Sequence, residues 1–384
     1  MTNEARVPFF LPTIGEEEIN EVLMTLKSGW LTTGAVARRF EEAFSNKIGG
    51  GVQSISVNSA TAGLHLALEA VGVERGDEVI TSPFTFTATC EVIRYLGADP
   101  VFVDIDPNSL NIDVHKIEAA ITEKTKAILP VHFAGLACEM GEIVRIARKH
   151  DLKVVEDAAH ALPTYYENQM IGSLDTDATV FSFYATKTIT TGEGGMVVTK
   201  NQEIADRCRT MRLHGISRDA FDRYTNIKPD WYYEVVAPGF KYNLTDLAAS
   251  IGVHQVERID SFMGLRKSIA EYYSASLAEC PIDLPPSDDG HAWHLYTIRL
   301  QQGAWCDRDT FINEMSEQGV SCSVHFIPLH LQPYWRDTYS LTPEQFPVST
   351  QTYTRIISLP LFPSMTQKQM SKVVAAVKSV LQCC

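Results

Sequence analysis

Short apolar runs alternate with helix-periodic segments along the first two hundred residues of the chain. Leu64, Leu68 and Val71, for example, repeat at the spacing of one helical face. Strands that alternate with helices favour an α/β fold, in which a large and mostly parallel sheet is covered on both faces. The apolar runs are Ile55–Val57, Val79–Thr81, Val101–Val103, Ala127–Val131, Val154–Val155, Thr179–Phe183 and Met196–Thr199.

The pattern changes near residue 250, so we predict two domains. Residues 1–250 would hold an N-terminal arm, a helix over Glu16–Lys27 and the large α/β domain, and residues 251–384 a smaller α+β domain. The further elements expected here are helices over Leu247–Tyr273, Asp307–Gln318 and Gln367–Leu381, and strands over His294–Leu300 and Ser321–Phe326.

Charge and composition narrow the class of protein. The 384 residues include 33 Lys and Arg against 47 Asp and Glu, which gives a net charge of −14. This acidic balance argues against a nucleic-acid-binding protein and against a polybasic membrane-surface protein. Prolines interrupt the longest uncharged stretch, Gln318–Trp335, so we predict no membrane span. The first residues lack the basic and apolar regions of a secretory signal, and we expect a cytoplasmic protein.

The cysteines and histidines do not form a metal-binding pattern. Eight Cys are scattered without a CxxC motif, and the eleven His form no HExxH motif. We therefore expect no metal site, and we interpret the cysteines as reduced cytoplasmic thiols in preference to a disulfide framework.

The stretch from Phe181 to Gly195 carries the first sign of chemistry. An apolar run leads into one lysine, Lys187, which is surrounded by hydroxyl residues and followed by a glycine-rich turn. A partly desolvated lysine has a lowered pKa and can form a Schiff base with an aldehyde, while hydroxyls and backbone N–H groups suit a phosphate. These are the needs of pyridoxal 5′-phosphate (PLP). By itself, the stretch fits a surface lysine before a flexible turn equally well.

Three other predicted strand ends carry residues that could bind the phosphate or the ring of PLP. A strand meets a helix at Asn58–Gly63, where free N–H groups would suit a phosphate, although Ser59 fits a plain helix cap as well. Asp157 ends a buried strand and could pair with a pyridine nitrogen, or it could cap a helix. Phe86 could stack on a flat ring or pack in the core. The separate structural explanations do not account for all four places lying at one edge of one sheet.

Ordered motifs across the chain resemble the DegT/StrS family of PLP-dependent nucleotide-sugar aminotransferases. Within this family, the sequence is most similar to enzymes that aminate a UDP-linked 4-keto-pentose. The resemblance implies a fold-type I PLP-dependent transferase. The matching motifs are Gly29–Gly34, Asn58–Gly63, Glu156–His160, Ser182–Gly195, Arg212–Gly215, Gly239–Asp246, His291–His294 and Val324–Phe326.

The resemblance also implies roles at the cofactor. Lys187 would bind PLP covalently, and Asp157 would pair with the pyridine nitrogen. His160 would contact the ring hydroxyl, and Phe86 would stack on the ring. The phosphate would be bound by Ala60, Thr61 and Ser182, and by Asn243 across the interface of a homodimer with shared active sites.

On the substrate side, the resemblance places Trp30, Thr33 and His325 along a sugar-nucleotide cleft. It implies transfer of the amino group of L-glutamate to a UDP- or dTDP-linked 4-keto sugar, in two half-reactions through pyridoxamine phosphate. The sequence departs from the usual family pattern at Leu162–Thr164 and at Thr188, so the identity of the sugar substrate is not fixed by the resemblance. Some relatives carry His at the lysine position and remove a hydroxyl; Lys187 argues against that chemistry here.

Four alternatives remain at this point. The acceptor could be a 3-keto sugar, or the protein could be a non-catalytic PLP-binding regulator. A fold-type I enzyme acting on amino acids would be expected to carry a carboxylate-binding Arg where Val324–Phe326 stands. A Rossmann-fold dehydrogenase would need a GxGxxG motif after the first strand, and the spacing of Gly49–Gly51 does not supply one.

Overall fold

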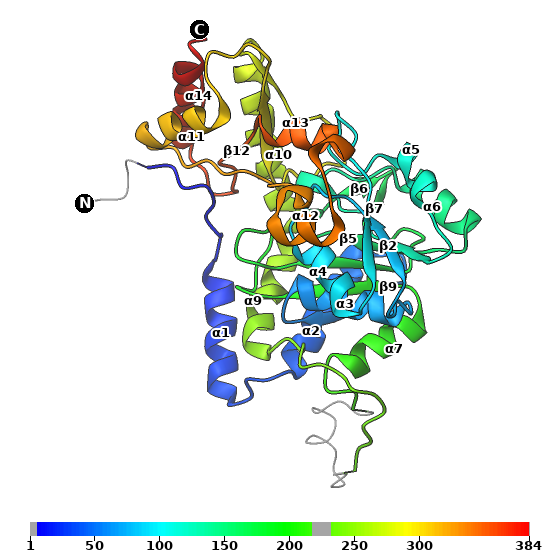
Figure 1. Ribbon diagram of the computed structural model, residues 1–384. Helices are drawn as coiled ribbons and strands as arrows, with labels where there is room; N and C mark the ends of the chain where they lie inside the picture. The colour runs from blue at the N-terminus through cyan, green and yellow to red at the C-terminus, as the bar shows by residue number, and fades with distance from the viewer. Residues whose placement is uncertain (1–5, 217–231, 384) are drawn as a thin grey trace.

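The computed structural model describes residues 6–216 and 232–383, which form a large α/β body and a smaller body rich in helices (Figure 1). The large body is built on a seven-stranded sheet of order β1-β9-β8-β5-β4-β2-β3. Its strands are β1 (Gln53–Val57), β2 (Glu78–Thr81), β3 (Asp99–Phe102), β4 (Thr125–Ile128), β5 (Lys153–Asp157), β8 (Ala178–Ser182) and β9 (Gly195–Thr199).

Strand direction brings the predicted site residues to one edge of this sheet. Strand β9 runs antiparallel to both β1 and β8, and the other neighbouring pairs are parallel. Consequently β1, β2, β5 and β8 all point the same way, and their carboxyl ends meet at one edge. Ligands of such sheets bind at this edge.

Adjacent strand residues pack on opposite faces, as a sheet covered on both sides requires. Val79 and Val155 belong to the apolar cluster on the α3 side, whereas Ile80 and Val154 belong to the cluster that contains Phe40 of α2. The helices of the large body are α1 (Glu16–Ser28), α2 (Ala35–Ile48), α3 (Ala60–Ala70), α4 (Ala88–Tyr95), α5 (Val114–Ile117), α6 (Met140–Lys149), α7 (Gln202–Met211) and α9 (Asp246–Glu257). A short hairpin, β6 (Tyr165–Tyr166) and β7 (Gln169–Met170), lies outside the main sheet.

The smaller body has its own apolar core around a three-stranded antiparallel sheet. Val7 of the N-terminal arm pairs with Val320 and is buried in this core, so the arm spans both bodies. The elements are α10 (Ile259–Leu277), β10 (Ile282–Asp283), β11 (Tyr296–Leu300), α11 (Arg308–Glu317), α12 (Pro333–Tyr339), α13 (Pro347–Tyr353), β12 (Ile356–Leu359) and α14 (Gln367–Leu381). The boundary at residue 250 stays a prediction.

Two predicted elements differ from the structure. The helix expected over Leu247–Tyr273 is two helices, because the chain turns at Arg258 so that α9 packs on α1 and α2 while α10 packs on α14. The strand expected over Ser321–Phe326 is wrong. Only Ser323 pairs with another strand, through a single bridge to Ser358, and a lone bridge does not make a strand.

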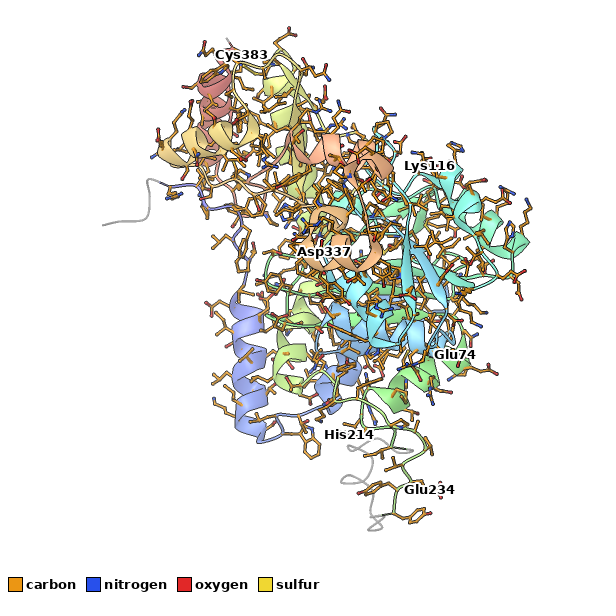
Figure 2. All side chains as sticks on the ribbon, in the orientation of Figure 1. Glu74, Lys116, His214, Glu234, Asp337 and Cys383 are labelled. Atoms are coloured by element: carbon orange, nitrogen blue, oxygen red, sulfur yellow. A yellow bond between two sulfur atoms is a disulfide. The ribbon has the colours of Figure 1, made fainter. Side chains whose placement is uncertain are left out.

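The interpretation of all cysteines as reduced thiols is also wrong for one pair. Cys280 and Cys383 form a disulfide that ties the end of α14, where Figure 2 labels Cys383, to the segment after α10. The two cysteines are 103 residues apart, so only the packing of α14 against α10 brings them together. Cys90, Cys138, Cys208, Cys306 and Cys322 are free, and Cys384 lies outside the described residues.

In the described part of the chain, every helix is too short or too polar to cross a membrane.

Candidate active site

A cavity of about 450 Å³ opens at the edge where the four strand ends meet. Residues of the smaller body and of the N-terminal arm line the side of the cavity that faces away from the sheet. Eight of the residues proposed from the sequence line it: Ala60, Thr61, Phe86, Asp157, His160, Ser182, Lys187 and His325.

Lys187 follows β8 on the loop that leads to β9, and its side chain reaches the cavity wall. The backbone N–H of Lys187 donates to the carbonyl of Tyr184 at 2.9 Å, which holds the loop in a tight turn. Burial lowers the pKa of Lys187 to about 8, and the charge of Asp157 opposes that change. A substantial fraction of this amine is therefore neutral and nucleophilic near neutral pH.

Asp157 is the last residue of β5 and is 5% exposed. Its Oδ2 accepts a 2.8 Å hydrogen bond from the Thr89 hydroxyl, and its Oδ1 accepts one from the Ala159 N–H at 3.1 Å. The Thr85 and Thr89 hydroxyls lie 2.9 Å apart. Because Thr89 donates its one hydroxyl proton to Asp157, Thr85 must be the donor in its bond with Thr89. Burial raises the pKa of Asp157, while the bonds from Thr89 and Ala159 oppose that rise.

The first turn of α3 lines the cavity through Ala60 and Thr61. Ser59 does cap this helix, since its hydroxyl accepts from the Ala62 N–H at 3.1 Å, and Ser59 also lines the cavity. The structural and functional interpretations of this serine are therefore compatible. A Cβ atom on Gly195 would lie 2.8 Å from the Ala60 nitrogen, so only glycine lets β9 approach the start of α3 this closely. The arrangement suits an anion such as a phosphate.

Two rings flank the cavity. Phe86 is 61% exposed, so the core-packing interpretation of this residue is not supported. His160 stacks on Phe326 with ring centroids 5.8 Å apart, and its buried Nδ1 has no hydrogen-bond partner. Burial, reinforced by the charge of Lys187, holds the pKa of His160 well below its usual range, so this ring is neutral.

His325 enters the cavity from the smaller body. Its Nδ1 lies 2.8 Å from the Ser358 hydroxyl, and Phe9 of the N-terminal arm stacks on it with centroids 5.6 Å apart. Burial lowers the pKa of His325 to about 4. The ring is therefore a neutral hydrogen-bonding group at neutral pH.

Trp30, Thr33 and Asn243 are not part of this cavity in the single chain. They form a separate cluster, in which the Asn243 side-chain amide donates to the Thr33 hydroxyl at 2.7 Å and the Trp30 indole donates to the Thr33 carbonyl at 3.2 Å. The Thr33 hydroxyl donates in turn to the carbonyl of Leu244.

Several cavity residues were missed by sequence reasoning. Thr85 and Thr89 follow a predicted strand end, and this position was an available signal. Phe9 and Phe10 of the arm and His294 and Phe326 of the smaller body also line the cavity. They come from segments far apart in sequence, and only the packing of the two bodies brings them together.

The residues present fit PLP. The cavity offers an amine of lowered pKa for the aldehyde, a buried carboxylate for the pyridine nitrogen and a helix N-terminus for the phosphate. The buried Nδ1 of His160, which has no hydrogen-bond partner, would suit the ring hydroxyl.

Comparison with known proteins agrees with this fit. The chain resembles a sugar aminotransferase from Streptococcus pneumoniae, Spr1654, solved in its PMP form, with a TM-score of 0.91 and 33% identity over 98% of this chain and 99% of that one. A PLP form of the same protein also matches. The architecture is therefore that of a fold-type I PLP-dependent aminotransferase.

The chain belongs to the DegT/DnrJ/EryC1/StrS aminotransferase family, whose family model matches residues 12–378. It is 46% identical to the spore coat polysaccharide biosynthesis protein SpsC of Bacillus subtilis, over 98% of this chain and 97% of that protein. It is 50% identical to protein MJ1066 of Methanocaldococcus jannaschii, over 99% of both chains. PLP is its cofactor.

Proposed function

We propose that this protein transfers the amino group of L-glutamate to the keto group of a nucleotide-linked sugar. The observation that carries the proposal is the convergence of Lys187, Asp157 and the N-terminus of α3 on one cavity. The similarity to a polysaccharide biosynthesis protein and to a sugar aminotransferase supports a sugar acceptor.

The lining from the smaller body also supports a sugar acceptor. Among the described residues that line the cavity there is no arginine, and the smaller body contributes His294, His325 and Phe326. Neutral imidazoles suit hydroxyl groups, whereas an amino-acid acceptor is commonly held by a guanidinium. Of the sugars, a UDP- or dTDP-linked 4-keto sugar is our proposal, and a 3-keto sugar is the second candidate.

Each residue at the cofactor has a proposed task. When bound, PLP supplies an aldehyde that carries the amino group and a ring that takes up electrons from the substrate carbon. Lys187 Nζ would bind the aldehyde carbon of PLP and, as a free amine, would move a proton between the substrate carbon and the cofactor carbon. Asp157 keeps the pyridine nitrogen protonated.

The remaining proposed contacts hold the cofactor in place. The phosphate is bound by the α3 N–H groups together with Ala60, Thr61 and Ser182. Phe86 covers one face of the ring, and His160 contacts the ring hydroxyl.

We propose a homodimer in which Asn243, Thr33 and Trp30 complete the cavity of the partner subunit. The observation in favour is that these residues form an ordered cluster outside their own cavity. Helix α1, next in the chain to this cluster, carries a run of exposed apolar side chains, with Ile19 50%, Leu23 45% and Met24 64% exposed, which a second copy would cover. A cytoplasmic location stays our prediction.

The experiment that tests the function is an absorption spectrum of the PLP-loaded protein before and after addition of L-glutamate. We expect the cofactor band to bleach as pyridoxamine phosphate forms, and 4-keto sugar nucleotides to restore it. In Lys187→Ala, we expect the rate of amino-group transfer to fall by about 10²- to 10⁴-fold, because the proton-transfer group is lost. A cofactor band that no amino donor changes would favour a non-catalytic PLP-binding protein. If only 3-keto sugar nucleotides restore the band, the acceptor is a 3-keto sugar and not a 4-keto sugar.

A further inference from the structure

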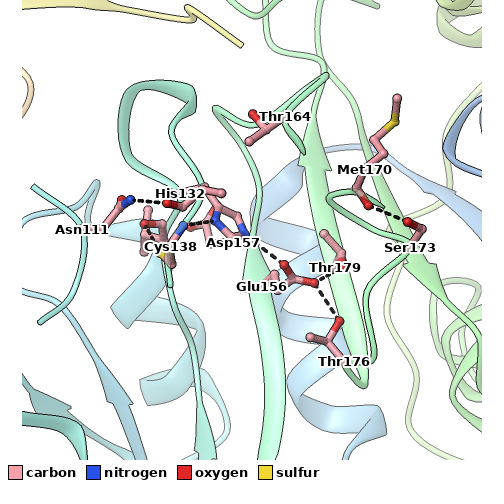
Figure 3. Close-up of polar contacts among 12 residues, drawn as sticks. Asn111, His132, Cys138, Glu156, Asp157, Thr164, Met170, Ser173, Thr176 and Thr179 are labelled. Carbon is pink, nitrogen blue, oxygen red and sulfur yellow. Dashed lines mark hydrogen bonds and ion pairs between the residues drawn. The ribbon is translucent and has the colours of Figure 1, made fainter. Parts of the chain in front are cut away.

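Glu156, directly before Asp157 on β5, points to the opposite side of the sheet and is completely buried. Its carboxylate accepts hydrogen bonds from Thr176 at 2.7 Å, from Thr179 at 2.6 Å and from His132 Nε2 at 3.0 Å. Figure 3 shows His132 on one side of Glu156 and the two threonines on the other. The carboxylate thus joins three neighbouring segments of the sheet: the loop after β4, strand β5 and the start of β8.

The protonation of His132 follows from its other contact. Its Nδ1 accepts the backbone N–H of Cys138 at 3.0 Å, so the ring proton sits on Nε2 and is donated to Glu156. The Cys138 thiol lies 3.2 Å from the Val131 carbonyl, which anchors the same loop. The ring of His132 is therefore held in one orientation toward Glu156.

Hydrogen bonds from the same loop also hold the backbone of Asp157. The His132 N–H donates to the Asp157 carbonyl at 3.1 Å, and the Asp157 N–H donates to the Pro130 carbonyl at 2.9 Å. The next residue, Ala158, donates its N–H to Val180 of β8 at 2.9 Å. His132 thus contacts two consecutive residues of β5, Glu156 through its ring and Asp157 through its backbone.

We propose that Glu156 is a positioning residue: with His132, Thr176 and Thr179 it fixes the carboxyl end of β5, so that Asp157 meets the pyridine nitrogen of PLP at the correct distance. The proposal rests on the proposed role of Asp157. The physical reason is that a charge-assisted hydrogen bond to a ring nitrogen tolerates only small displacements, and a buried carboxylate with three donors resists displacement strongly.

The test compares two buried threonines of the same sheet. Thr179→Val removes a donor to Glu156. Thr199→Val is the matched control, because the Thr199 hydroxyl donates to the Asp177 carbonyl at 2.6 Å and does not contact the network. For each variant, the dissociation constant of PLP is measured by titrating the apoprotein, and the midpoint of thermal unfolding is measured without PLP.

We expect both variants to lower the unfolding midpoint by similar amounts. Only Thr179→Val should also weaken PLP binding, by about five- to tenfold, and this effect should largely disappear when Asp157→Asn is already present, because residues that act through one another are not additive. Glu156→Gln, which removes the charge but keeps the shape, should behave like Thr179→Val.

Other outcomes would contradict the proposal in separable ways. If Asp157→Asn weakens PLP binding but Thr179→Val acts equally with and without it, or no more than Thr199→Val, then Glu156 has only a structural role. If Asp157→Asn itself leaves PLP binding unchanged, the proposed role of Asp157 fails and the positioning role with it.

Discussion

At the scale of single residues, the site combines a lysine and an aspartate whose pKa values burial moves in opposite directions. Burial favours the neutral form of each group, so the pKa of Lys187 falls while that of Asp157 rises. The mutual attraction of the two charges opposes both changes, and the bond from Thr89 opposes the rise in the pKa of Asp157. Lys187 is thereby left partly neutral while Asp157 retains donors that favour its ionised form.

The lowered pKa of Lys187 predicts how PLP attachment depends on pH. Only the neutral amine attacks an aldehyde, and the neutral fraction grows as the pH rises through about 8. We therefore expect the rate of PLP attachment to the apoprotein to increase from pH 6, to reach half of its maximum near pH 8 and to level off roughly one pH unit above that. Stopped-flow absorbance measures this rate. A rate that still climbs steeply beyond pH 10 would mean that the amine has the pKa of a free lysine.

The Thr85–Thr89–Asp157 chain predicts a second effect on PLP. Thr89→Val removes a hydrogen bond to a charged group, which contributes about 1.5–3 kcal/mol. PLP binding should weaken about tenfold, with little loss of fold, because valine has nearly the same shape. Thr87→Val on the same turn is the control: the Thr87 hydroxyl contacts Glu91 and Trp335, and not Asp157. Equal dissociation constants for the two variants would contradict the role of Thr89.

At the scale of elements, the contact between β9 and α3 shapes the proposed phosphate site. Gly195→Ala would place a methyl group 2.8 Å from the Ala60 nitrogen, and backbone atoms cannot rotate away as a flexible side chain can. We expect the start of α3 to be pushed outward, PLP affinity to fall about tenfold, and stability to fall by about 1–3 kcal/mol.

Gly264→Ala on α10 is the control for that variant. A methyl group there would have open space around it, and alanine in a helix is favoured over glycine by about 0.5–1 kcal/mol. This variant should be as stable as the parent or slightly more stable, with unchanged PLP affinity. A Gly195→Ala protein that binds PLP like Gly264→Ala would show that the α3 N-terminus does not bind the phosphate. Thermal unfolding and PLP titration measure both quantities.

At the scale of the whole molecule, the proposed homodimer with shared active sites predicts complementation between two inactive variants. Lys187→Ala disables the cavity of its own chain, whereas Asn243→Ala would disable the cavity of the partner subunit. A mixed dimer would then carry one site with both defects and one intact site. Unfolding and refolding the two variants together should restore up to about a quarter of the parent activity, since half of the dimers are mixed and each has one working site. Each variant refolded alone is the control, and no recovery on mixing would argue against shared sites.

Sequence-based predictions are accurate where the physical cause lies in neighbouring residues, and they fail where it lies in contacts between distant segments. The seven apolar runs all became strands of the main sheet, and α14 has the predicted bounds Gln367–Leu381, because burial periodicity is a property of consecutive residues. The break at Arg258, the missing strand at Ser321–Phe326 and the Cys280–Cys383 disulfide depend on which distant segments pack together.

The sequence by itself determined the alternation of strands and helices and the edge of the sheet where Lys187 and Asp157 meet, since parallel strands bring their carboxyl ends together. The chemistry of these two residues is a prediction from the same sequence. Only the tertiary structure decided the rest. Thr89 lies 68 positions from Asp157, and His132 lies 24 positions from Glu156. Phe9 of the N-terminal arm lies 316 positions from His325. Such contacts arise from close packing in three dimensions, where sequence spacing gives no guide to which polar groups find partners.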